Sequence, residues 1–135
     1  MKADIFKTLR DYFSEKADIH TVLLYGSAAD NTFAEESDID LAVAGEGELT
    51  PDELVEIHQT LEKMLSRKVD LRDLSRLHGL ILSQVLLYGT MIKKADPAYF
   101  EKRMSEMIEF RQDILPIQRE GMICRLKEFV HGLHF

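Results

Sequence analysis

The chain has 135 residues, which is typical of one compact domain, so we expect a single domain over residues 1–135. Hydrophobic residues make up 45% of the sequence and charged residues 30%, which excludes an intrinsically disordered protein. Acidic residues outnumber basic ones by 24 to 17, and the net charge of −7 argues against direct binding to nucleic acid. A single cysteine excludes a disulfide framework, and without a signal-peptide core or a membrane-spanning apolar stretch we expect a soluble, cytoplasmic protein.

The first third of the chain predicts one helix and two strands. Apolar residues at helical spacing indicate an opening amphipathic helix (Ile5, Leu9, Tyr12 and Phe13). The β-prone run 21–25 stops at a Gly-Ser pair and is typical of a buried strand followed by a turn. After a polar segment, the run 39–43 predicts a second strand.

The next segment predicts a helix and a third strand. Thr50 is a good helix cap, Pro51 suits the first helical position, and Glu53 stands three residues after the cap. Apolar residues then recur at helical spacing as far as Leu65. The short run 69–71 is flanked by charge and predicts a third strand.

The rest of the chain is mostly helical in pattern. Ser75 is the expected cap of a helix that ends at Gly89, and Met91 and Ile92 indicate a short further strand. From residue 96 the apolar stripe is helical again, is broken at Pro116, and resumes in a final helix. We therefore expect an α+β fold: a small mixed sheet of three to four strands packed by helices (core about 1–95), with a helical C-terminal extension, 96–135.

One window carries chemistry: Gly26-Ser27 at the end of the first strand, then ten residues, then Asp38-x-Asp40 at the start of the second. Alternate residues of a strand share a face, so Asp38 and Asp40 project together. Carboxylates are oxygen ligands of the kind that Mg²⁺ takes, and a third from a neighbouring strand, Asp70, completes a two-metal arrangement for displacement at phosphorus. The Gly-Ser turn offers backbone N–H groups for nucleotide phosphates. These parts together predict nucleotidyl transfer.

Asp73 competes with Asp70 for the role of third carboxylate. Strand alternation puts Asp70 and Arg72 on one face and Asp73 on the other, which favours Asp70. Basic residues around this strand (Arg67, Lys68, Arg72 and Arg76) suit a solvated rim, or a surface that steers nucleotide phosphates.

The pattern resembles the signature of the DNA-polymerase-β-like nucleotidyltransferase superfamily. The short chain and the runs Ser37-Asp-Ile-Asp-Leu-Ala-Val and Val69-Asp-Leu-Arg-Asp-Leu are similar to minimal nucleotidyltransferases (MNT). Many of these are encoded beside a HEPN-domain ribonuclease toxin and act as its antitoxin. The resemblance covers roughly residues 20–95 by motif and the helical tail more loosely.

The resemblance implies a role for each matched residue. Asp38, Asp40 and Asp70 would be catalytic and would bind Mg²⁺, as two ions, with Asp70 as a metal ligand or as base for the acceptor hydroxyl. The nucleotide-binding residues would be Gly26, Ser27 and Ser37. The implied reaction transfers AMP from ATP to a tyrosine of a cognate HEPN toxin and so blocks its ribonuclease activity.

One departure leaves two alternatives open. Many relatives carry an arginine soon after Gly-Ser, where this chain has Ala28-Ala-Asp-Asn31, so the triphosphate cradle is expected to be weaker. A catalytically weak antitoxin would then neutralise its toxin by binding alone. The other alternative is an adenylyltransferase for a small acceptor of the aminoglycoside type, although only about 40 residues remain after Asp96 to build an acceptor pocket.

Overall fold

A computed structural model gives the fold and describes residues 2–26 and 38–114. The elements follow in the order α1 (Lys2–Ser14), β1 (Ile19–Tyr25), β2 (Ile39–Gly45), α2 (Pro51–Leu65), β3 (Val69–Asp73), the 3-10 helix η2 (Leu74–Arg76), α3 (Gly79–Tyr88), β4 (Thr90–Lys94) and α4 (Pro97–Ile114). Within these ranges, no helix is long and apolar enough to cross a membrane.

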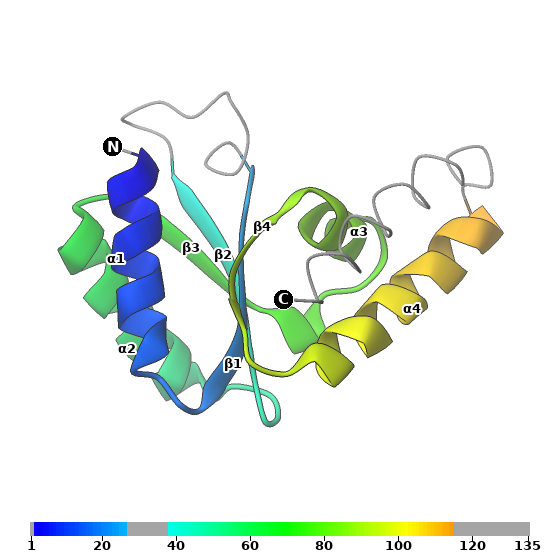
Figure 1. The fold of residues 1–135 in the computed structure, drawn as a ribbon, viewed down its shortest axis with the longest axis horizontal. Helices are drawn as coiled ribbons and strands as arrows, with labels where there is room; N and C mark the ends of the chain where they lie inside the picture. The colour runs from blue at the N-terminus through cyan, green and yellow to red at the C-terminus, as the bar shows by residue number, and fades with distance from the viewer. Residues whose placement is uncertain (1, 27–37, 115–135) are drawn as a thin grey trace.

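The four strands form one mixed sheet in the order β3-β2-β1-β4. β1 pairs antiparallel with β2 and β4, whereas β2 and β3 are parallel because α2 carries the chain back across one face. In Figure 1, α1 and α2 lie on one side of the sheet, and α3 and α4 lie on the other. The predicted α+β fold with a small mixed sheet is confirmed.

The sheet separates two hydrophobic clusters because successive side chains of a strand point to opposite faces. On β1, Val22 and Leu24 belong to the cluster under α1 and α2, whereas Leu23 belongs to the cluster under α3 and α4. All three side chains are fully buried, as expected for a central strand covered on both faces.

The predicted start of α2 is confirmed in detail. The Thr50 hydroxyl accepts a hydrogen bond from the backbone N–H of Glu53 at 3.1 Å, and the Glu53 carboxylate accepts one from the N–H of Thr50 at 3.4 Å. Pro51 occupies the first turn, where its missing N–H costs nothing. This capping box fixes the point at which the chain leaves β2 for the crossover.

The expected capping role of Ser75 is wrong. Ser75 lies in η2, where its own N–H and hydroxyl both donate to the carboxylate of Asp73, and α3 begins four residues later at Gly79. The buried carboxylate of Asp73 thus takes the capping role at the end of β3. The predicted end of α3 is confirmed, because the N–H of Gly89 donates to Val85 at 2.9 Å.

The remaining predicted strand and helix positions can be compared where the chain is described. The short strand expected at Met91 and Ile92 is β4, and β3 extends two residues beyond the predicted run. Met104 and Met107 of α4 are buried in the hydrophobic cluster under α3 and α4. The predictions for Pro116 and the final helix fall outside the described residues.

Candidate active site

Three polar residues form a row across one end of the sheet. Tyr25 pairs in register with Asp40, and Asp40 pairs with Asp70. Directly paired residues of neighbouring strands share a face, so all three side chains lie on the face that carries α3 and α4. Tyr25 packs against the cluster on that face. The strands thus bring Asp40 and Asp70 together although they lie far apart in the chain.

Asp40 lies at the centre of this row, and its surroundings disfavour the charged form of its carboxyl group. Partial burial raises the pKa of its carboxyl group, and the negative charges of Asp70 and Asp38 raise that pKa further. Arg72 acts in the opposite direction. The negative charges of Asp38 and Asp70 therefore act on Asp40 near the start of β2, where a cation would stabilise its charged form.

Asp70 is exposed and lies beside Arg72, whose Nε donates to its carboxylate at 3.4 Å. The predicted alternation on β3 is confirmed, because Asp73 is buried and Asp70 is not. Within residues 2–26 and 38–114, no three acidic, histidine or cysteine side chains are close enough to form a ready metal-binding group. The carboxylates are near enough to interact electrostatically but are not gathered around one point.

Gly26 follows β1 directly and adopts a φ of 72°, in the left-handed region that favours glycine. A Cβ atom at this position would overlap Oδ2 of Asp40. The glycine therefore makes room for the central carboxylate, a reason that the sequence pattern alone did not reveal. The other expected phosphate-binding residues, Ser27 and Ser37, fall outside the described residues, as does the segment 28–31.

A cavity of about 420 Å³ opens beside Asp40, between the end of the sheet and α3. It is lined by Tyr25, Gly26, Asp40, Gln84 and Tyr88. The Tyr25 hydroxyl is buried without a hydrogen-bond partner among the described residues, and burial raises the pKa of Tyr25 to about 12. The sequence prediction missed Tyr25, Gln84 and Tyr88. For Gln84 and Tyr88, the available signal was a polar and an aromatic residue four apart in a mostly apolar helix.

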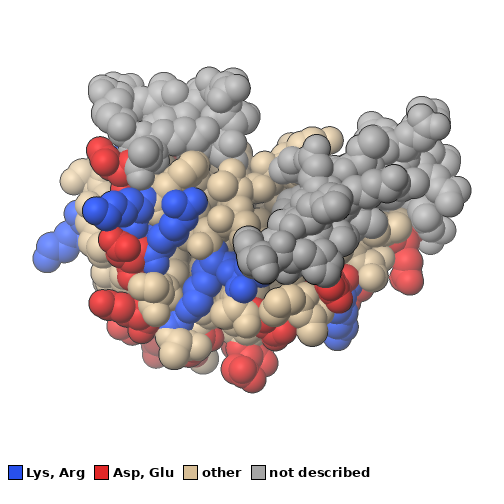
Figure 2. All heavy atoms as spheres, in the orientation of Figure 1, with Lys and Arg blue, Asp and Glu red and all other residues tan. Residues whose placement is uncertain are grey.

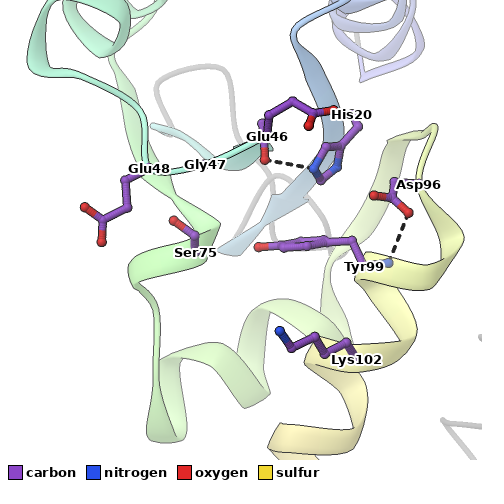
Figure 3. Close-up of a pocket in the computed structure, with 9 residues that line it drawn as sticks. His20, Glu46, Gly47, Glu48, Ser75, Asp96, Tyr99 and Lys102 are labelled. Carbon is purple, nitrogen blue, oxygen red and sulfur yellow. Dashed lines mark hydrogen bonds between the residues drawn. The ribbon is translucent and has the colours of Figure 1, made fainter.

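A second cavity, also of about 420 Å³, lies at the opposite end of the sheet (Figure 3). His20, Tyr99 and Lys102 line it together with residues of the loop that joins β2 to α2. Both ring nitrogens of His20 already have partners, the Thr21 hydroxyl at 2.7 Å and the Gly45 carbonyl at 2.9 Å. None of the predicted site residues lines this cavity, so the candidate active site is the cavity that contains Asp40.

The acidic excess of the chain is unevenly spread over its surface. In the view of Figure 2, acidic side chains follow the lower edge of the molecule, and basic side chains lie above them over the middle of that face.

Comparison with known proteins identifies the family. The model of the polymerase beta nucleotidyltransferase family matches residues 7–98. The chain belongs to this family. No curated protein matches the chain significantly. The match contains the Gly26 turn and all three carboxylates, so the predicted family is confirmed from an independent direction.

Solved structures of the same fold extend this result. A toxin–antitoxin complex with AMP-PNP contains a chain of 27% identity and TM-score 0.66, with 93% of this chain and 98% of that chain covered. A mutant of the MntA–HpeT toxin–antitoxin gives 25% identity and TM-score 0.67, with coverage of 94% and 98%. The fold is also that of a chain in the complex of tri-AMPylated Shewanella oneidensis HEPN toxin with MNT antitoxin, at 22% identity, TM-score 0.67 and coverage of 94% and 99%. These neighbours are similar over nearly their whole length, as expected for minimal nucleotidyltransferases.

Proposed function

We propose that this nucleotidyltransferase is an antitoxin that transfers AMP from ATP to a tyrosine of a cognate HEPN ribonuclease toxin. The observation that carries the proposal is the pairing of Asp40 with Asp70 across β2 and β3, with Asp38 also near enough to act on the carboxyl group of Asp40. A partly buried carboxylate held beside two others is costly unless a cation joins them, and family membership gives such a cluster a chemical purpose.

The residues present fit magnesium. Mg²⁺ prefers carboxylate oxygens and often completes its shell with water and substrate phosphates, so two or three aspartates suffice. Asp38 and Asp40 would hold the ion, and Asp70 would join them once it leaves Arg72. Bound magnesium would neutralise charge on the triphosphate and on the leaving pyrophosphate.

The chain's own residues have three tasks in this reaction. The turn at Gly26 and Ser27 binds the triphosphate through backbone N–H groups. Asp70 accepts the proton of the acceptor hydroxyl, whose oxygen forms a new bond to the α-phosphorus. The bond from that phosphorus to the bridging oxygen breaks, and pyrophosphate leaves with the electron pair. Once Asp70 no longer pairs with Arg72, the guanidinium group of Arg72 can pair with the negatively charged phosphates.

Two observations support a protein as the acceptor. The chain carries a net charge of −7, which suits docking on a protein that binds RNA through a basic surface. Several structural neighbours are toxin–antitoxin complexes, and one contains a tri-AMPylated HEPN toxin. The acceptor is therefore proposed to be a tyrosine of a HEPN partner.

The test is co-expression with a candidate HEPN partner, followed by the intact mass of that partner after incubation with ATP and Mg²⁺. We expect the partner to gain the mass of one or more AMP groups. The double variant Asp38→Asn with Asp40→Asn should abolish the gain, and Asp11→Asn, an exposed aspartate on α1, should leave it intact. A wild-type reaction that adds no AMP mass would contradict the proposal.

One observation favours a second candidate, neutralisation by binding alone. Asp70 faces Arg72, and the described residues contain no ready metal-binding group. Under this alternative the Asp38→Asn, Asp40→Asn variant still protects cells from the toxin. Under enzymatic neutralisation the same variant forms the complex but no longer protects.

A further inference from the structure

The cavity beside Asp40 has two chemically different walls. Gly26 and Asp40 belong to the proposed phosphate and metal site, whereas Gln84 and Tyr88 come from α3. Its volume of about 420 Å³ falls within the range of about 300–1,000 Å³ usual for small-molecule pockets. The cavity is therefore large enough for more than the phosphates.

The two residues of α3 that line the cavity, Gln84 and Tyr88, differ from the rest of this helix. Residues four apart share one helix face, so Gln84 and Tyr88 point in the same direction. Half of the residues of α3 are buried, yet Gln84 is exposed and Tyr88 keeps 65% of its surface accessible. An aromatic ring and an amide left accessible beside a catalytic carboxylate are suited to a flat, polar-edged ligand.

The position of the cavity shows which part of a nucleotide it would accept. A triphosphate at the Gly26 turn leaves the nucleoside two directions, across β2 toward Asp70 or across β1 toward α3. The first direction leads to the carboxylate proposed to activate the acceptor. The second leads into the cavity, so the nucleoside and the acceptor approach Asp40 from opposite sides.

We propose that Tyr88 and Gln84 form the nucleobase subsite and select adenine. The Tyr88 ring stacks on the base, and the Gln84 amide accepts from N6 and donates to N7 of adenine. Guanine offers two acceptors at the corresponding edge, so the same amide pairs with it less well. This proposal rests on the proposed function, because it assumes a nucleotide with its phosphates at Gly26.

The experiment measures the binding of non-hydrolysable ATP and GTP analogues to the full chain with Mg²⁺ by calorimetry. Gln84→Leu should reduce the preference for ATP over GTP about tenfold. Tyr88→Ala should weaken both nucleotides by a similar factor of about ten, and Tyr88→Phe should retain binding. Leu80→Ala is the matched control, because Leu80 lies on the same exposed face of α3 but does not line the cavity.

Failure of this subsite is distinguishable from failure of the proposed function. Suppose that wild-type protein binds ATP and transfers AMP, while Gln84→Leu keeps the wild-type preference and Tyr88→Ala keeps the wild-type affinity. The proposed subsite is then wrong, and the proposed function stands. If wild-type protein binds neither nucleotide, both proposals are wrong. Thermal unfolding of each variant verifies the fold, since substitutions at exposed helix positions should change stability little.

Discussion

Asp40 is half-buried near the start of β2 and Asp73 is buried at the end of the neighbouring strand β3, and the surroundings of the two carboxylates are opposite. The Asp73 carboxylate accepts hydrogen bonds from the backbone N–H of Leu49 at 2.8 Å and from both donors of Ser75, and Arg76 lies 3.8 Å away. Asp40 is instead surrounded by the charges of Asp38 and Asp70, and its pKa is raised. Among the described residues, hydrogen-bond donors thus surround the carboxylate that serves the structure, whereas like charges act on the carboxylate proposed to bind a ligand.

The largest expected effect is the loss of Asp73. Asp73→Ala leaves the buried N–H of Leu49 and the partly buried N–H of Ser75 without their acceptor, which should lower the free energy of unfolding by about 3 kcal/mol. Urea unfolding measures this change. Asp70→Ala is the control on the same strand and should cost under about 1 kcal/mol, because its pair with Arg72 is exposed. Similar costs for the two variants would remove the distinction between structural and functional carboxylates.

The next effect is at Gly26. Gly26→Ala places a Cβ atom against Asp40 Oδ2 in a backbone conformation that alanine avoids, which should cost about 2 kcal/mol of stability and displace the central carboxylate. AMP transfer should fall at least about tenfold. Gly47→Ala is the matched control, since no atom lies within 4 Å of its Cβ position. Full activity in Gly26→Ala would show that Asp40 does not need its present position.

A smaller effect is the pH dependence caused by Asp40. The pKa of Asp40 is raised in the folded protein above its ordinary value of 3.8, which applies to the unfolded chain. Ionisation of Asp40 therefore favours unfolding, and stability falls as the pH rises from the unfolded pKa to the folded pKa. Asp40→Asn should therefore stabilise the protein at pH 7 by under about 1 kcal/mol, since solvent screens this half-open site. The difference should vanish below about pH 4. Thermal melts across this range measure it, and a destabilised variant at pH 7 would contradict the electrostatic interpretation.

Local patterns in the sequence predicted the strands, the α2 capping box and the side of β3 on which Asp70 lies, because they depend on residues a few positions apart. Contacts made by residues distant in the chain were not predictable in this way. Asp73 accepts a hydrogen bond from the N–H of Leu49, 24 positions away, and no local pattern predicted this contact. Gln84 comes beside Asp40 only because α3 packs over the end of β1. Hydrophobic periodicity indicates which face of a strand or helix is buried, but it does not indicate which helix packs against that face.

The central claim is that Asp40 and its neighbours bind a divalent cation together with a nucleotide. Its most direct test is calorimetric titration of Mg²⁺ and a non-hydrolysable ATP analogue into the wild-type chain, Asp40→Asn and the control Asp11→Asn. We predict that wild type and Asp11→Asn bind alike and that Asp40→Asn binds at least about tenfold more weakly. Equal binding by Asp40→Asn and wild type would contradict the claim.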